Sequence, residues 1–186
     1  MKVISLHKDQ SDLIKKAQVK NREAQKELFT LHAPKMLSVC RQYIKDFQYA
    51  EEAMLNGFLK VFTHINKFES RGSFEGWVRR IMINESISLL RKYKKTVLID
   101  DETFFKSAAI NHFETETNVS ELQYLVDNLQ DDYRIVFNLF AVEGYKHKEI
   151  AKLLQITVNT SKMRFFKARK QLQGQYAQLN NIRNGK

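Results

Sequence analysis

The stretch HKEIAKLLQITVNTSKMRFFKARKQL, residues 147–172, has the pattern of two short helices joined by a tight turn. Its first half, His147 to Leu154, places apolar residues at helical spacing. The joint follows at Gln155, and Thr157 is suited to cap a second helix from Val158 to about Gln173. This arrangement predicts a helix-turn-helix, whose second helix lies in the major groove of DNA.

The second of these helices has two chemically different sides. Phe165, Ala168 and Leu172 should form its buried side. Asn and Arg side chains can pair with adenine and guanine edges, while Lys and Thr suit phosphates. The candidate DNA contacts on the other side are Asn159, Thr160, Lys162, Met163, Arg164, Lys167, Arg169 and Lys170.

A plainer interpretation is a solvated amphipathic helix whose charges only keep the protein in solution. From Lys146 to Lys170, however, there are eight Lys or Arg residues and one acid, Glu149. Mixed charge therefore does not account for the pattern, and DNA binding is the better interpretation. The joint usually favours glycine, so we expect Gln155 to adopt a strained backbone conformation.

Composition narrows the class of protein. A net charge of +10 over 186 residues favours a polyanionic partner, nucleic acid first and an anionic membrane surface second. The single cysteine, Cys40, excludes an internal disulfide framework and a multi-cysteine zinc site. We find no apolar run long enough for a signal peptide or a membrane span, so we expect no stable membrane insertion and a cytoplasmic location.

The rest of the chain is also helical in its periodicity, and strand-like alternation does not persist anywhere. Pro34 should kink or interrupt the helix that contains it, because proline lacks the backbone N–H. Ser73 can cap a helix that ends in the basic run Arg91 to Lys95. The other helices are expected at residues 9–18, 21–45, 48–66, 121–128 and 131–142.

Residues 96–120 differ from both flanks. They contain five acids against a single Lys106, and they lack a sustained helical stripe. A segment of this length is unusual inside a compact domain, so it predicts a flexible acidic linker. The expected fold is therefore all-α, with helical domains at 1–95 and 121–186, the C-terminal one a helix-turn-helix.

A second informative block is KFESRGSFEGWVRRIMINESISLLRK, residues 67–92. A short loop with Arg71 and Gly72 leads into a helix that carries Phe74 and Trp77 among several cations. Aromatic faces and positive charges together suit single-stranded nucleic acid, because bases stack and phosphates are neutralised. Aromatics at helical spacing are also common in ordinary cores, and the spacing alone does not separate the two interpretations.

The order of the blocks resembles the extracytoplasmic-function (ECF) branch of bacterial RNA polymerase sigma factors. AEEAMLNGFLKVFTHINKF (50–68) is similar to the helix that docks on the polymerase clamp. GSFEGWVRRIMIN (72–84) is similar to the block that recognises and melts the minus-ten element. LQDDYRIVFNLFAVEGYKHKEIAKLLQITVNTSKMRFFKARKQL (129–172) is similar to the domain that reads the minus-thirty-five element.

The resemblance implies a role for each block. Domain 1–95 would be sigma region 2, and domain 121–186 would be sigma region 4. The implied clamp-docking residues are Glu51, Glu52, Leu55, Asn56, Phe58 and Lys60. The implied contacts to the unpaired strand are Phe68, Arg71, Ser73, Phe74, Trp77, Arg80 and Asn84. The implied partners are core RNA polymerase, promoter DNA and an anti-sigma factor, whose identity the sequence does not indicate.

Two rival functions are weighed against this one. A conventional regulator that binds duplex DNA would leave residues 72–84 without a task, and binding to core polymerase separates it from a sigma factor. An enzyme acting on nucleic acid would need a phosphate loop, a metal-binding motif or a nucleophile arrangement, none of which is recognisable. The five histidines are scattered, and Cys40 suits a small buried hydrophobe. We therefore expect no catalysis, cofactor or bound metal.

Overall fold

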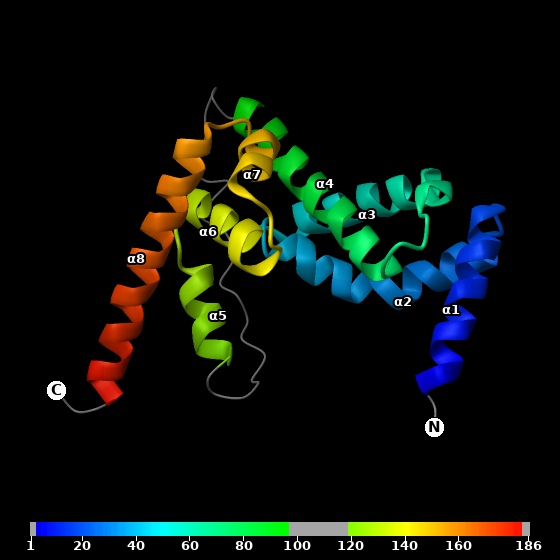
Figure 1. The fold of residues 1–186 in the computed structure, drawn as a ribbon, viewed down its shortest axis with the longest axis horizontal. Helices are drawn as coiled ribbons and strands as arrows, with labels where there is room; N and C mark the ends of the chain where they lie inside the picture. The colour runs from blue at the N-terminus through cyan, green and yellow to red at the C-terminus, as the bar shows by residue number, and fades with distance from the viewer. Residues whose placement is uncertain (1–2, 97–118, 184–186) are drawn as a thin grey trace. The chain divides into compact units, whose positions relative to one another are not determined.

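The computed structural model describes residues 3–96 and 119–183, and these residues form helices and short connections without a strand. The chain divides into two compact units, Met1–Lys106 and Ser107–Lys186 (Figure 1). The expected all-α architecture with two helical units is confirmed. Nearly all of the predicted linker lies outside the described residues, so its limits stay a prediction.

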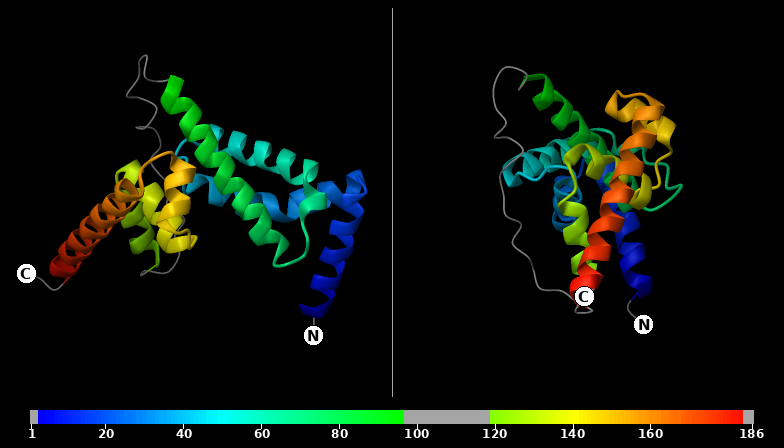
Figure 2. Two further views of the ribbon diagram at one scale, coloured as in Figure 1. Left: turned by 45° about the horizontal axis from the view of Figure 1, so that its top comes forward. Right: turned by 90° about the vertical axis from the view of Figure 1, so that its left-hand side faces the viewer.

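The first unit contains four α-helices and one short 3-10 turn in its described part. Helix α3 packs against both α2 and α4, and α1 packs on α2 (Figures 1 and 2). Each range lies close to its expected position, although α1 begins at Val3 rather than Asp9. The elements are α1 (Val3–Gln18), α2 (Arg22–Arg41), α3 (Phe47–Thr63), η1 (Ile65–Lys67) and α4 (Phe74–Thr96).

Three of these helices begin at a polar side chain that satisfies an otherwise unpaired backbone N–H. Asn21 Oδ1 accepts from the Ala24 N–H at 3.0 Å and Asp46 Oδ1 from the Tyr49 N–H at 3.0 Å. Ser73 Oγ accepts from the N–H of Gly76 at 3.0 Å, so the predicted cap of α4 is confirmed. Such caps stabilise a helix by about 1 kcal/mol and set where it starts.

Of the kink or interruption expected at Pro34, the interruption is not found: α2 runs from Arg22 to Arg41 with Pro34 inside it. Leu28, His32 and Met36 on the same helix are all buried against the rest of the unit. Burial of a large apolar side chain contributes about 1.5–3 kcal/mol, and a proline inside a helix costs about 3 kcal/mol. Burial on both sides of Pro34 therefore offsets the missing hydrogen bond.

The second unit places α8 against α6, α5 and α7 (Figure 1). Ala168 and Leu172 of α8 pack into a core with Leu125, Val126 and Leu129, which confirms two residues of the predicted buried side. The third, Phe165, is half-buried against the ring of Phe140. The expected helix over 131–142 is present, but its second half is wound as a π-helix. The elements are α5 (Val119–Asp127), α6 (Asp131–Phe137), η4 (Asn138–Val142), α7 (His147–Leu154) and α8 (Val158–Arg183).

The joint between α7 and α8 has the geometry that its sequence predicts. Gln155 lies in the left-handed region at φ 55° and ψ 44°, and its N–H donates to the Ala151 carbonyl. Thr157 Oγ1 accepts from the Thr160 N–H at 3.0 Å and so caps α8. The helix-turn-helix is confirmed, although α8 continues to Arg183 rather than ending near Gln173.

Candidate nucleic-acid interfaces

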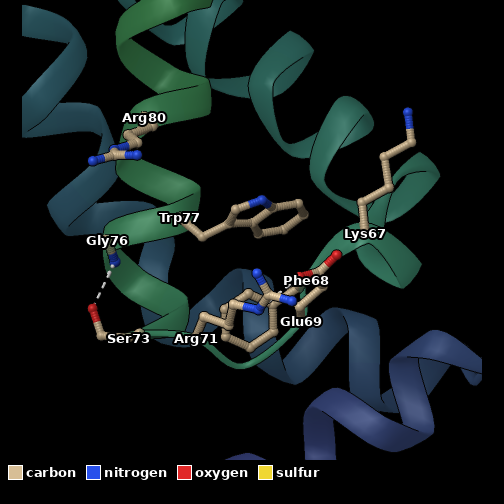
Figure 3. A pocket seen from close by; sticks show the side chains of 9 residues that line it. Lys67, Phe68, Glu69, Arg71, Ser73, Gly76, Trp77 and Arg80 are labelled. Carbon is tan, nitrogen blue, oxygen red and sulfur yellow. Dashed lines mark hydrogen bonds and ion pairs between the residues drawn. The ribbon is translucent and has the colours of Figure 1, made fainter.

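A cleft of about 380 Å³ lies in the first unit, between the loop after η1 and the first turns of α4 (Figure 3). Phe68 and Trp77 supply its aromatic surface, with ring centroids 5.6 Å apart. Lys67, Arg71 and Arg80 surround these rings with positive charge. The cleft combines a surface for stacking with cations for a phosphate backbone.

Phe74 supports this cleft from beneath instead of lining it. Its side chain is 5% exposed and packs at 5.2 Å from Phe68 and 5.8 Å from Trp77, measured between ring centroids. The ring also contacts His32 of α2 at 5.6 Å. Phe74 is therefore covered in this structure, because the first turn of α4 faces α2, and its contact with an unpaired strand stays a prediction. Ser73 is likewise occupied, as the cap of α4.

The loop also brings an acid into the cleft. Glu69 Oε2 lies 3.0 Å from Nε of Arg71, and Ser70 between them has a left-handed backbone at φ 56°. Figure 3 shows the two side chains meeting beside Phe68. Sequence reasoning missed Lys67 and Glu69 as lining residues, since their only signal was proximity to Phe68. Farther along α4, Asn84 is exposed one turn after Arg80.

Burial also affects the protonation of His32, which lies beneath the cleft. His32 is 4% exposed, and its Nε2 lies 2.9 Å from the side-chain nitrogen of Gln10. Burial lowers the pKa of His32; the Glu75 carboxylate opposes this shift and the Lys35 ammonium adds to it. The imidazole that supports Phe74 is therefore neutral near pH 7.

A second candidate surface is the outward face of α3. Leu55 and Leu59 are 51% and 67% exposed and lie one turn apart. Glu51, Glu52 and Asn56 are exposed beside them. Leu59 was not among the predicted docking residues, although its i+4 spacing from Leu55 was a usable signal. The result is an apolar strip with an acidic edge.

Two predicted docking residues on α3 have other contacts. Phe58 is 3% exposed and packs edge-on against Phe29 with ring centroids 4.7 Å apart, so its ring is covered in this structure and its docking role stays a prediction. Its ring points inward because α3 must cover α2. Lys60 Nζ lies 2.6 Å from Oε1 of Glu85 on α4. Lys60 therefore ties α3 to α4 in the free chain.

The third surface is the outward face of α8, which carries no acid along its length. Met163 is 48% exposed and Phe166 is 66% exposed, an unusual apolar pair among cations. Phe166 was missed by sequence reasoning, which assigned contacts only to polar residues and Met163. The other exposed residues on this part of the helix are Asn159, Lys162, Lys167, Arg169 and Lys170.

Two residues of α8 that are predicted to contact DNA form contacts within the protein instead. Arg164 Nη2 lies 2.6 Å from Oδ2 of Asp132 on α6, with the two side chains 22% and 28% exposed. Thr160 is half-buried, and its hydroxyl lies 2.8 Å from that of Thr157. Lys167 is exposed, with its ammonium 5.8 Å from the ring centre of Tyr133.

His147 fixes the start of α7 against α8, the recognition helix of the helix-turn-helix. Its Nδ1 lies 2.9 Å from Oγ of the buried Ser161, and its ring stacks on Phe140 at 4.4 Å. Burial lowers the pKa of His147, and the nearby Lys162 ammonium lowers it further. This histidine is structural, as its isolated position in the sequence suggests.

Comparison with known proteins matches these units to one family. Residues 28–96 match the family model for Sigma-70 region 2, and residues 120–172 match the model for Sigma-70, region 4. The chain is 25% identical to the ECF RNA polymerase sigma factor SigW of Bacillus subtilis over 179 residues, covering 89% of this chain and 96% of that one. It is 24% identical to the RNA polymerase sigma-H factor of Pseudomonas aeruginosa over 170 residues, covering 84% and 88% of the two chains.

The fold agrees with these matches. The sigma factor RpoE, solved in complex with the anti-sigma factor NepR from Bartonella quintana, superposes with a TM-score of 0.56 at 23% identity, covering 80% of this chain and 94% of that one. The two units define a protein of the sigma-70 class, with regions 2 and 4 in that order. More narrowly, the chain belongs to the ECF sigma factors, which direct RNA polymerase to promoters.

Two further structural observations concern membrane-spanning helices and metal sites. Within the described ranges, no helix is both long enough and apolar enough to cross a membrane. The same ranges contain no group of three or more His, Cys, Asp or Glu side chains placed to hold a metal ion.

Proposed function

We propose that the cleft at the start of α4 captures an unpaired base of the non-template strand and so helps to melt the minus-ten element. The main support for this proposal is the cleft itself. The exposed parts of Phe68 and Trp77 lie there with Lys67, Arg71 and Arg80 around them. Taking a base out of the duplex costs about a few kcal/mol, which stacking and phosphate contacts offset.

The outward face of α3 is proposed as the docking surface for core polymerase. Leu55 and Leu59 supply apolar contacts, and Glu51, Glu52 and Asn56 supply polar ones. The solved relative RpoE is bound to an anti-sigma factor, and we extend such a partner to this chain. In this proposal the protein is not an enzyme: it works in the cytoplasm, where the polymerase performs the chemistry.

The outward face of α8 is proposed to read the minus-thirty-five element. Asn159 suits an adenine edge, and the methyl group of thymine suits apolar Met163 and Phe166. Lys162 and Lys170 then serve the phosphates. Specific reading by this face and strand capture by the cleft are separate steps, so they can be tested separately.

In vitro transcription with core polymerase is the direct test of the whole function. Promoter-specific transcripts should form only when this protein is added. A conventional regulator would bind duplex DNA without associating with core polymerase, and that result would overturn the roles proposed for the cleft and for the α3 face.

Strand capture is tested by a combined alanine variant at Arg71, Arg80 and Asn84, all of which are exposed. We expect this variant to bind core polymerase and reach promoter duplex, but to lose permanganate reactivity of unpaired thymines near the start site. A template with a pre-melted mismatched bubble should restore much of its activity, because the bubble removes the unpairing cost.

A matched control removes two exposed cations away from the cleft, with Lys16→Ala and Lys26→Ala in one chain. This control should open the promoter as the parent does. Circular dichroism must show both variants folded. If the folded cleft variant opens duplex promoters as well as the parent does, strand capture by this cleft is wrong.

A further inference from the structure

Asp132 places a carboxylate beside a helix that carries only positive charges. Its Oδ2 lies 2.6 Å from Nη2 of Arg164, and α6 packs along α8 at this point. The adjacent Asp131 instead pairs with the buried Arg134 at 3.2 Å. The two acids of the first turn of α6 therefore have different partners: one within α6 and one on the recognition helix.

The pair is poorly explained as a contribution to folding. The two side chains are 22% and 28% exposed, and desolvation of the two charges offsets much of the attraction between them. The α6–α8 contact already rests on Tyr133 and Phe137 of α6, which pack against a core that includes Ala168 and Leu172 of α8. The clearer consequence of the Asp132–Arg164 pair is electrostatic. Arg164 must give up its contact with Asp132 before its guanidinium can neutralise a DNA phosphate, and breaking that contact costs free energy.

We propose that Asp132 is a positioning residue that holds Arg164 away from phosphates and so lowers the affinity of α8 for DNA of any sequence. The inference rests on the proposed reading of DNA by α8. Non-specific binding depends almost wholly on phosphate neutralisation, whereas specific binding also uses base contacts. Withholding one cation therefore weakens binding to DNA of any sequence by the same factor, because a phosphate contact carries no sequence information.

The test is Asp132→Asn in the full chain, titrated with a labelled random-sequence duplex over a salt series. Release of Arg164 should add about 0.9 to the salt slope, which corresponds to one more phosphate contact. At 0.1 M salt this is about five- to tenfold tighter binding to random DNA. In competition assays with polymerase present, the preference for promoter over random DNA should stay unchanged, because both complexes gain the same contact.

Three controls isolate the cause. Asp127→Asn makes the same change of charge in the same unit, where the carboxylate accepts from Gln123 at 3.1 Å; it should leave the slope nearly unchanged. The double variant Asp132→Asn with Arg164→Gln should lose the gain. Arg164→Gln alone should also leave the slope of the parent unchanged, a result that does not depend on the folding of the Asp132 variant.

The outcomes separate the two proposals. An unchanged slope in folded Asp132→Asn, a gain that persists without Arg164, or an equal gain in Asp127→Asn would overturn the role of Asp132. A slope that falls by about 0.9 in Arg164→Gln alone would show that Arg164 already contacts phosphate. If the parent binds no duplex even at low salt, the DNA-reading role of α8 fails, and the role of Asp132 fails with it.

Discussion

His32 shows how one buried side chain joins three parts of the first unit. It lies 2.9 Å from Gln10 of α1 and packs against Phe74 beneath the cleft, while its own backbone belongs to α2. Burial holds the pKa of His32 below its ordinary value. Protonation of this ring would place a charge where water cannot solvate it, so the fold favours the neutral imidazole.

The first prediction follows from the sign of this shift. A lowered folded-state pKa means that the stability from neutral His32 is fully present above about pH 6.5 and declines as the pH falls below that value. Denaturant titration gives the free energy of unfolding of the first unit at pH 7.5 and at pH 5.5. This free energy should fall less between the two pH values in His32→Gln than in the parent. His147 is retained in both chains, so its own titration cancels. An equal loss in parent and variant would contradict the prediction.

Phe166 carries a residue-scale prediction about recognition. Its side chain is 66% exposed, so Phe166→Ala should change stability by no more than about 0.5 kcal/mol. Transcription from the cognate promoter should nevertheless fall, while the salt slope on random DNA stays the same, because no phosphate contact is removed. Tyr176→Ala, also exposed on α8, is the matched control and should transcribe normally. Equal activity of both variants would remove Phe166 from the interface.

At the scale of elements, the joint between α7 and α8 determines how the recognition helix is presented. Gln155 holds a left-handed backbone that costs a residue with a Cβ about 1–2 kcal/mol. Nearby contacts maintain this conformation: the Gln155 and Ile156 N–H groups both donate to the Ala151 carbonyl, and His147 meets Ser161 across the two helices. The joint is strained but firmly anchored.

Gln155→Gly should therefore stabilise the second unit. Glycine relieves the backbone strain, and its extra freedom in the unfolded chain returns about 0.5–1 kcal/mol of that gain. We expect a net increase of about 0.5–1 kcal/mol in the free energy of unfolding by denaturant titration. Gln173→Gly makes the same exchange inside α8 and should instead destabilise by about 1 kcal/mol. A destabilised Gln155→Gly variant would show that the side chain matters more than the strain.

At the scale of the whole molecule, the chain contains two separately packed units. The region 2 match ends at residue 96, and the region 4 match begins at residue 120. Between them lies the acidic segment that the sequence predicts to be a linker, outside the described residues. Each unit has its own core, so each can remain folded when the connection is cut.

Limited proteolysis of the free protein should therefore cut first within residues 96–120 and leave two helical fragments. Mass spectrometry of the early products, with circular dichroism of each fragment, gives the result. First cleavage inside α3 or α8, with the segment still intact, would show that the predicted linker is the better protected part of the chain.

Local features of this protein could be predicted from its sequence because they depend on residues close together in the chain. Ser73 and Thr157 accept hydrogen bonds from backbone groups three residues later, and Gln155 stands where one helix must end and another begin. Apolar residues at helical spacing likewise predict Ala168 and Leu172 as core. The order of the three sequence blocks along the chain was then enough to predict the family.

Only the tertiary structure decided which side chains remain available to a partner. Phe58 and Phe74 are core residues because of the helices they meet, while Phe166 is exposed on a face of α8 that the described helices leave uncovered. Arg164 is held by Asp132, and Lys60 by Glu85, from helices elsewhere in the sequence. Helical periodicity defines the faces of one helix, but the direction in which each face points depends on packing between helices distant in the chain.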